Sequence, residues 1–341
     1  MLKIKKSNLA ALFAKIAEAN DLYLPVKAAG KTKFAAWNAD AEVDLDTLKT
    51  VKSAKDAFFP QSEGLYSCEK RDGKISITSE KLRSEPFVIF GIRGCDVKAI
   101  DVLDRVFLSD PVDSYYAARR EHGILVSLAC GAPEVSCFCK TFGIDAAAPA
   151  GDVVTWMVGD ELYWDAKTAK GEALTAQVRD LLTEGDSAVV EAEQQNIRAI
   201  YEKLPNGELS LDGWGAEAAK TRFDSPIWEQ LYKPCLACGT CTFVCPTCQC
   251  YDIKDYYTGN GVKRYRCWDS CMYSDFTMMA HGNNRTSQMQ RFRQRFLHKL
   301  AYYPANNDGM FSCVGCGRCV DKCPSKLNIV KVIKAFGKED A

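Results

Sequence analysis

The chain has 341 residues, enough for two domains, and its 44 Lys and Arg residues balance 44 Asp and Glu residues to a formal net charge of zero. This balance argues against a nucleic-acid-binding protein, which neutralises phosphates with an excess of basic residues. The cysteine count of seventeen is odd, so the cysteines cannot all be paired within the chain, and a disulfide framework is typical of much shorter secreted proteins.

The N-terminal segment begins basic and then becomes apolar, but Lys15, Glu18 and Asp21 interrupt it and no small-residue cleavage site follows. It predicts an amphipathic helix rather than a signal peptide. No apolar stretch approaches the roughly 18 residues that a membrane-spanning helix needs. The sequence therefore predicts a cytoplasmic protein without a membrane span, in a compartment where thiols stay reduced.

Residues 1–225 predict an α/β domain with a mixed sheet. Residues 86–93 and 123–128 are short apolar runs that predict buried strands, and apolar residues at helical spacing between them predict a crossover helix with Asp96 as its N-cap. In the rest of the domain, residues 64–78 and 152–165 predict hairpins. Residues 170–182 and 188–204 predict amphipathic helices, and residues 206–225 predict a linker.

Cysteines follow both buried strands. Cys95 comes where the first strand meets its helix, and Cys130, Cys137 and Cys139 share the loop after the second strand. If the strands are parallel, their carboxyl ends lie on one edge of the sheet and the four thiols converge there, the number that a third cluster requires. Two alternatives stay open. The thiols are inert and buried, or one member of the tight C-x-C pair lies outside the ligand set.

A C-x2-C-x2-C-x3-C run followed by proline occurs twice in residues 226–341, and this pattern is typical of iron–sulfur ligation. A zinc site has no use for the third cysteine and the trailing Cys-Pro. The two runs predict two [4Fe–4S] clusters in an α-helical, ferredoxin-like domain. In two-cluster ferredoxins the fourth cysteine of each run ligates the other cluster. The predicted ligands are Cys235, Cys238, Cys241 and Cys323 for cluster one, and Cys313, Cys316, Cys319 and Cys245 for cluster two.

A long insertion separates the two runs and carries further cysteines. Cys248 and Cys250 follow the first run, and Cys267 and Cys271 come later. They are interpreted either as neighbours that pack against a cluster or as ligands of another one. Residues 285–299 contain five basic residues, no acid and an apolar face. Their basic side chains predict a solvated surface; the alternative is that they bind an acidic partner or offset the charge of the clusters.

The familiar catalytic motifs are absent from the sequence. No glycine-rich dinucleotide or P-loop motif is present, so the chain is not expected to bind NAD(P)H or ATP itself. The three histidines have no metal-site spacing, and no nucleophile comes with a recognisable base. No catalytic residue is assigned. An electron-transfer subunit is therefore favoured over a self-sufficient enzyme.

Several stretches appear in an order that resembles a known family: FGIRGCDVKAIDVLDRVF, LACGAPEVSCFCK, CLACGTCTFVCPTCQCYDI, RCWDSCMYSDF and CVGCGRCVDKCP. The chain is similar, over residues 55–335, to the iron–sulfur subunit that anaerobic sulfite reductase shares with cytosolic sulfhydrogenases, where it is the beta subunit. A related subunit occurs in flavin oxidoreductases associated with heterodisulfide reductase. The family's cysteine pattern extends beyond the eight ferredoxin-type positions to Cys95, Cys130, Cys137, Cys139, Cys248, Cys250 and Cys271, whereas Cys267 departs from it.

The resemblance implies a subunit with an FAD/NAD(P)H-binding reductase subunit on one side and a terminal redox subunit on the other. The leading hypothesis is accordingly an electron relay through two [4Fe–4S] clusters and a third near Cys95. Two alternatives belong to other classes. One is a catalytic reductase subunit with an open-coordination cluster near Cys95, and the other is a purely structural cluster protein.

Overall fold

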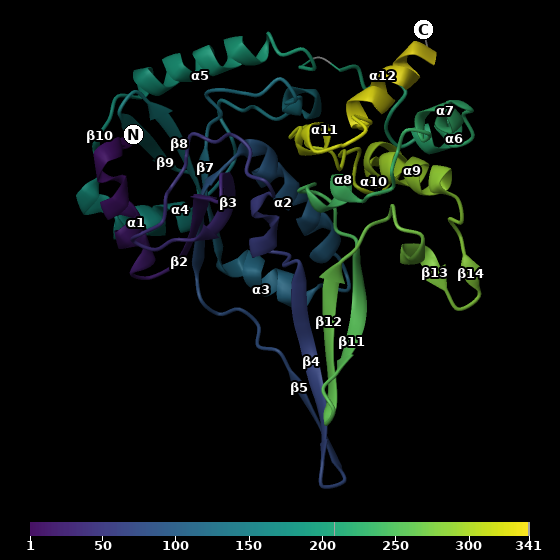
Figure 1. The fold of residues 1–341 in the computed structure, drawn as a ribbon. Helices are drawn as coiled ribbons and strands as arrows, with labels where there is room; N and C mark the ends of the chain where they lie inside the picture. The colour runs from purple at the N-terminus through teal and green to yellow at the C-terminus, as the bar shows by residue number, and fades with distance from the viewer. Residues whose placement is uncertain (208, 340–341) are drawn as a thin grey trace.

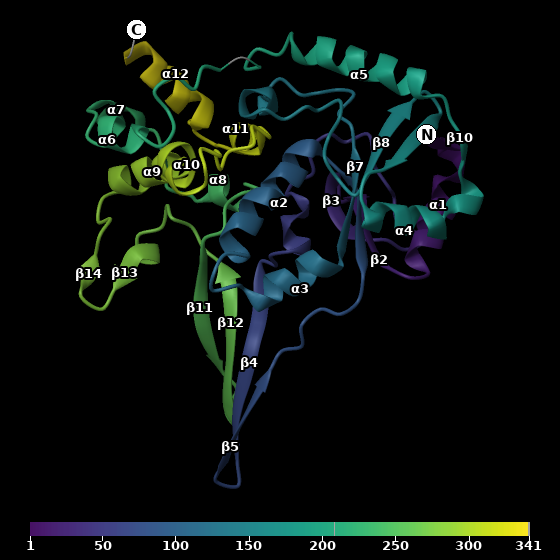
Figure 2. The ribbon, with the colours of Figure 1, turned by 180° about the vertical axis from the view of Figure 1, so that it is seen from behind.

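The computed structural model describes residues 1–207 and 209–339; residues 340–341 of the predicted second domain lie outside this part. The chain forms an α/β half around a large mixed sheet and a smaller, helical half that carries both cysteine runs (Figures 1 and 2). A long β arm projects away from both halves. None of the described helices is long and apolar enough to cross a bilayer.

In the described residues the large sheet has eight strands, of which β2, β6, β7 and β8 run parallel to one another while the other pairings are antiparallel. Both apolar runs form the predicted buried strands, and both predicted hairpins are confirmed. In spatial order the strands are β10 (Thr183–Glu184), β1 (Leu2–Lys5), β9 (Glu161–Ala166), β8 (Val153–Val158), β7 (Gly123–Leu128), β6 (Phe87–Ile92), β2 (Asp21–Ala28) and β3 (Lys31–Ala36).

Helices cover both faces of this sheet. Side chains alternate along β6, so Val88 and Phe90 pack with α1 (Leu9–Ala17) and α4 (Ala169–Gln177). Phe87 and Ile89 point to the opposite face and pack with the two helices that connect β6 to β7. These are α2 (Gly94–Phe107) and α3 (Ser114–His122). The helix α5 (Ser187–Tyr201) packs against β8 and β9.

The predicted start of α2 is wrong. The N-cap is Arg93, so Cys95 and Asp96 already lie in the first turn of the helix. The Arg93 guanidinium holds this position because it donates to Ala129 O at 2.8 Å and to Leu45 O at 2.6 Å. The Asp96 carboxylate does not cap the helix; it binds Arg318 of the second cysteine run.

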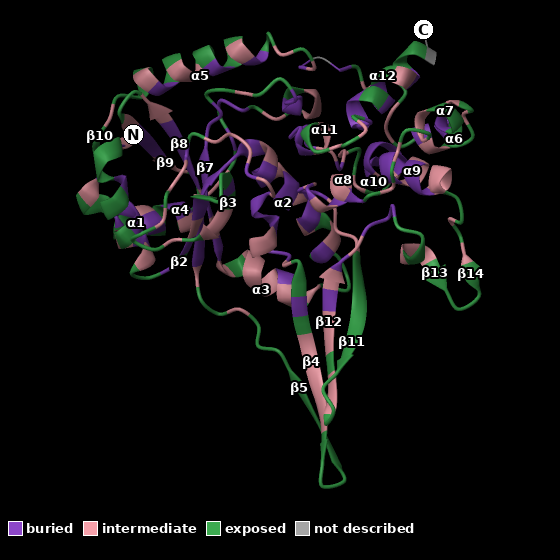
Figure 3. Cartoon of the chain, in the orientation of Figure 1, coloured by how far each residue is buried: buried purple, intermediate pink, exposed green. Residues whose placement is uncertain are grey.

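The arm unites segments that are distant in sequence. In spatial order it contains β11 (Tyr251–Tyr257), β12 (Gly261–Trp268), β4 (Ser62–Arg71) and β5 (Lys74–Ser79). Thus the insertion between the cysteine runs pairs with the N-terminal hairpin, and buried Arg266 binds Glu63, 203 residues away in sequence. The base of the arm is buried, whereas its tip is exposed (Figure 3).

The helical half has its own core, in which Trp228, Phe292, Phe296 and Phe336 are almost fully buried. Leu209 and Ala218 belong to the same core, so the described part of residues 206–225 is not the predicted linker. The elements are α6 (Ala218–Arg222), α7 (Ile227–Leu231), α8 (Thr240–Phe243), the short β13 (Met278–Met279) and β14 (Gly282–Asn283), α9 (Gln288–Leu297), a π-helical turn (His298–Tyr302), α10 (Tyr303–Asn306), α11 (Arg318–Asp321) and α12 (Ile329–Glu339).

Candidate metal centre

The two cysteine runs fold into matching loops. Ala237 (φ 52°) and Gly315 (φ 60°) occupy the same position of the two runs, and so do Gly239 (φ 71°) and Gly317 (φ 78°). In each run the backbone is left-handed at two positions. Glycine, which adopts this conformation without strain, occupies these positions except at Ala237. Each loop then enters a short helix, α8 or α11, and these two helices lie against each other. The sequence repeat is therefore also a repeat of the backbone.

With the exception of exposed Cys238, the cysteines of the two loops are buried or half-buried. Cys245 of the first run interacts electrostatically with Cys313, Cys316 and Cys319, the three cysteines predicted to share cluster two with it. Burial raises the pKa of Cys316 to about 12, so the free thiol stays protonated; metal ligation requires the thiolate and releases the proton.

The remaining cysteines of the runs lie together in the same region. Cys241 interacts with Cys235 and Cys238 of its own run. Cys323 packs against the same apolar core as Cys235 and Cys241. Its sulfur accepts a hydrogen bond from Leu327 N at 3.2 Å, in the turn that precedes α12. The fourth cysteine of the second run is thus held at the end of its loop, close to the helical core.

Buried cations surround the cysteines. Arg295 is 3% exposed and donates to Cys241 O at 3.2 Å, while its Nε has no hydrogen-bond partner. Lys299 is 4% exposed and donates to Thr247 Oγ1 at 2.7 Å and Ser312 O at 3.1 Å. Neither forms a salt bridge with a carboxylate in the part of the chain that the structure describes. The predicted solvated surface is therefore wrong for these residues.

Unpaired buried cations are costly unless negative charge lies beside them. The groups of potential negative charge with which Arg295 and Lys299 interact most strongly are cysteine sulfurs. Iron–sulfur clusters with thiolate ligands are negatively charged, so they would be the partners that these cations lack. The Nε of Arg295, which has no hydrogen-bond partner, is a donor for a cluster or ligand sulfur. The residues around the two runs therefore fit [4Fe–4S] clusters.

A third cation comes from the α/β half. Lys55 lies in a short 3-10 helix (Ala54–Ala57) and is 4% exposed. Its Nζ donates to Cys245 O at 3.2 Å and Cys248 O at 2.8 Å and lies 3.6 Å from the centre of the Trp268 ring. Burial lowers the pKa of Lys55 to about 8, so neighbouring negative charge is needed to hold its proton firmly. Nothing in the local sequence singles out this residue.

Of the four cysteines predicted to form a third site, three lie close together and the fourth, Cys95, lies at the edge of the group. Cys130, Cys137 and Cys139 are each buried, and Tyr201 of α5 is also buried and interacts with Cys130 and Cys139. Burial raises the pKa of Cys137 to about 11 and that of Cys139 to about 12. Cys95 interacts with Cys139 and also with Cys316, so it adjoins both this group and the second cysteine run. Tyr201 has no sequence signal beyond its place at the end of an amphipathic helix.

The loop of the third site packs directly on the second cysteine run. Phe138 N donates to Gly315 O at 2.9 Å. A Cβ atom on Gly315 would lie 2.4 Å from Phe138 O, and one on Gly317 would lie 2.6 Å from Ser136 O. These glycines therefore serve two purposes: they allow the left-handed turn and they let the two loops approach.

We expect Gly315→Ala to lower the free energy of unfolding by more than the roughly 1–2 kcal/mol that left-handed backbone costs an alanine, since its Cβ also collides with Phe138. Gly309→Ala is the matched control, because Gly309 has φ 79° and open space around its Cβ position. Anaerobic denaturation of the cluster-loaded protein measures both. Equal losses in the two variants would mean that the contact with Phe138 contributes nothing.

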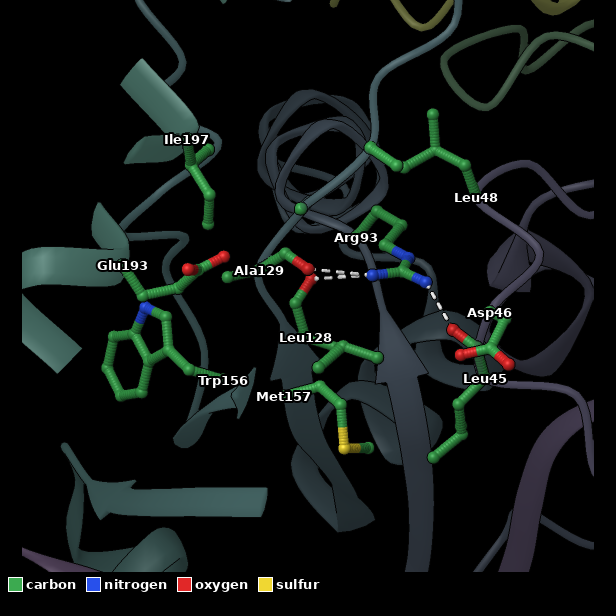
Figure 4. Close-up of a pocket in the computed structure, with 12 residues that line it drawn as sticks. Leu45, Asp46, Leu48, Arg93, Leu128, Ala129, Trp156, Met157, Glu193 and Ile197 are labelled. Carbon is green, nitrogen blue, oxygen red and sulfur yellow. Dashed lines mark hydrogen bonds between the residues drawn. The ribbon is translucent and has the colours of Figure 1, made fainter. Parts of the chain in front are cut away.

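A pocket of about 250 Å³ opens at the carboxyl edge of β6, β7 and β8 (Figure 4), and Ala129 and Gly131, the sequence neighbours of Cys130, are among its lining residues. Arg93, Trp156, Met157, Glu193 and Ile197 are among the residues that line it. The Arg93 guanidinium is already bound to backbone carbonyls, including Leu128 O, and also interacts electrostatically with Cys130. This edge is where open α/β sheets commonly bind ligands.

The cysteines outside the two runs separate into two kinds. Cys248 lies beside Cys245, and Cys250 and Cys271 lie beside Cys248 and each other, all buried or half-buried. Cys267 instead lies on β12 of the arm, opposite Ser62 and Asp252. Cys68, also on the arm, is half-buried. Within the described residues no three His, Cys, Asp or Glu side chains are placed to hold a single metal ion. In a [4Fe–4S] cluster, each cysteine ligates a different iron, so its ligands are spread more widely.

A family model described as a 4Fe-4S dicluster domain matches residues 234–327, which span both cysteine runs and the insertion. The chain is also 31% identical, over 336 residues, to sulfhydrogenase 2 subunit beta of Pyrococcus furiosus. That alignment covers 97% of each chain, so it includes the α/β half and the arm as well as the cysteine runs. No solved structure matches the chain.

Proposed function

Since the chain belongs to the iron–sulfur subunit family of the sulfhydrogenase beta subunit, we propose that it relays electrons within a hydrogenase-type complex. On one side of the relay is a flavin- and NAD(P)H-binding reductase subunit, and on the other is a terminal redox subunit of the sulfite reductase, hydrogenase or heterodisulfide reductase type. The observation that carries the proposal is the pair of matching cysteine loops with unpaired buried cations around them.

In this proposal the ligands are those expected from the ferredoxin pattern: Cys235, Cys238, Cys241 and Cys323 hold cluster one, and Cys313, Cys316, Cys319 and Cys245 hold cluster two. The contacts of Cys245 with the second run support the exchange of the fourth ligands. Bound clusters supply one-electron redox chemistry. Arg295 and Lys299 offset their negative charge, and the surrounding aromatic core excludes water.

Cys130, Cys137, Cys139 and Cys95 are proposed to hold a third cluster. The Tyr201 hydroxyl, which interacts with Cys130 and Cys139, would be a donor to its ligand sulfurs. Phe138 binds Gly315 of the second run, and Cys95 interacts with Cys316, so this cluster would neighbour cluster two. The relay would then continue from the cysteine runs into the α/β half.

The test is to count iron and acid-labile sulfide in anaerobically purified protein and to follow the clusters by EPR during a redox titration. Two clusters require about eight iron atoms per chain and three require about twelve. An iron content well short of eight would contradict the dicluster assignment. Clusters that resist reduction by dithionite would contradict a relay and favour a structural role.

Replacing Lys299 by Met is expected to make the midpoint potential of cluster two more negative, because the reduced cluster carries an additional negative charge that Lys299 stabilises. A loss of about 1.4 kcal/mol corresponds to roughly 59 mV for a one-electron couple. Lys334→Met, in an exposed position of α12, should leave the potential unchanged. EPR-monitored titration of both variants measures the effect, and equal potentials would contradict the role of Lys299.

The pocket beside Cys130 favours a second candidate, a catalytic reductase subunit whose third cluster keeps an iron position open to substrate. This candidate predicts that the isolated chain, without partner subunits, changes its EPR spectrum when sulfite or a disulfide is added. An unchanged spectrum would leave electron relay as the function of the chain.

A further inference from the structure

Four sulfurs that belong to different parts of the sequence lie together beside the first cysteine loop. The Cys245 and Cys248 side chains interact with each other, and so do those of Cys250 and Cys271. Cys248 also interacts with Cys250 and with Cys271, so the two pairs adjoin. Only Cys245 among them has a place in the ferredoxin pattern, which leaves three neighbouring thiols unused.

The protein fixes this group from several sides. Asp269 N donates to Cys250 O at 2.9 Å, and Thr242 Oγ1 donates to Ser270 Oγ at 2.9 Å, both between buried or half-buried residues. The loop that carries Cys271 is thereby attached to the first cysteine run. Lys55 attaches the same run to the α/β half through the carbonyls of Cys245 and Cys248. The thiols therefore lie in a built site rather than on a mobile loop.

Three buried cations lie around the group. Lys299, Lys55 and Arg295 are at most 4% exposed and each interacts with sulfurs of this group. No salt bridge joins any of the three to a carboxylate within the described residues. Cluster two offsets part of this charge through Cys245. Three positive charges in a buried volume nevertheless favour further thiolates, because buried charge without a partner is expensive.

We propose that Cys248, Cys250 and Cys271 are ligands of an additional iron–sulfur centre, next to cluster two and distinct from the site at Cys130. Each of the three thiols loses its proton to solvent when it binds iron. The three thiols adjoin Cys245 and one another, and cysteine thiolates are the ligands of iron–sulfur centres. The inference rests on the proposed relay, to which it adds one step.

The position of this centre follows from its neighbours. Cys245 ligates cluster two in the proposed function and contacts Cys248, so it links the two centres directly. Trp268 lies beside Lys55 at the base of the β arm. The additional centre therefore lies where the cysteine loops, the arm and the α/β half meet. An electron that leaves cluster two then has a route toward the arm as well as one toward Cys95.

The experiment compares iron and sulfide content, with EPR spectra of the reduced protein, in the full chain and in Cys250→Ser and Cys271→Ser variants. Each variant is expected to lose about two to four iron atoms per chain, the content of one centre, together with one EPR component. Cys267→Ser is the matched control, since Cys267 is only four positions from Cys271 but lies outside the group. It should keep all its iron.

Full iron content in both variants would overturn the proposal and leave these cysteines as packing neighbours of cluster two. A loss of iron in Cys267→Ser equal to that in Cys271→Ser would overturn it as well, because the effect would then be general damage. Cys241→Ser separates the proposals: if it loses iron while Cys250→Ser and Cys271→Ser do not, the dicluster relay stands and the additional centre fails.

Discussion

Replacing Asp96 by Asn is expected to lower the free energy of unfolding by about 3–5 kcal/mol, the cost of leaving one partner of a buried salt bridge uncompensated. Asp96 and Arg318 are each 2% exposed, and the guanidinium donates to both carboxylate oxygens, at 2.5 and 2.7 Å. Arg318 also donates to Thr50 O at 3.1 Å. One side chain of the second cysteine run thus fastens the run to the α/β half.

Anaerobic denaturation of the cluster-loaded protein measures this loss. The matched control is Asp308→Asn, because Asp308 pairs with Arg105 at 2.9 Å but its side chain is 89% exposed, and such pairs contribute at most about 1 kcal/mol. The double variant Asp96→Leu with Arg318→Met removes both charges and should recover part of the stability. A single Asp96→Asn variant as stable as the control would contradict the role of this pair.

Replacing Cys241 by Ser is expected to remove cluster one, with a loss of about four iron atoms per chain and of the corresponding EPR signal. Cys241 lies beside Arg295 and the other thiols of its run, where it is the third cysteine of the ferredoxin pattern. Electron transfer through the chain should fall with the cluster if the relay passes through it.

Cys68→Ser is the control for this variant, because Cys68 lies on the arm, opposite Val262 and Ile77, away from the cysteine loops. The control should keep its full iron content and redox titration. A Cys241→Ser protein that retains all of its iron would contradict the ligand assignment, and one that loses iron but transfers electrons normally would place cluster one outside the relay.

The features that the sequence predicted well are local ones. The spacing of Cys235, Cys238 and Cys241 is a constraint within a few residues, and the loop that it predicts has the left-handed backbone at Gly239 that such a loop needs. The strand at residues 86–93 is similar: its unbroken apolar run indicates burial on both faces, and all six residues of β6 are buried.

The features that the sequence did not predict depend on distant contacts. Arg295 belongs to a basic, amphipathic segment, and only the position of Cys241 and Cys319 beside it explains its burial. Asp96 has the sequence features of an N-cap, yet Arg318, 222 residues away, takes its carboxylate. The pairing of β12 with β4 has no signal in either segment, because each alternates like half of an ordinary hairpin.

The shared arm also has a consequence for the order in which the protein is made. Glu63 leaves the ribosome 203 residues before Arg266, and at about 5–20 residues per second this interval lasts roughly 10–40 s. During that time the edge of β4 that later pairs with β12 has no partner, and Lys55 has none of the sulfurs that surround it in the finished protein. The arm and the surroundings of Lys55 can therefore form only after the second half of the chain has been made. Iron insertion and closure of the arm are accordingly late steps of biogenesis.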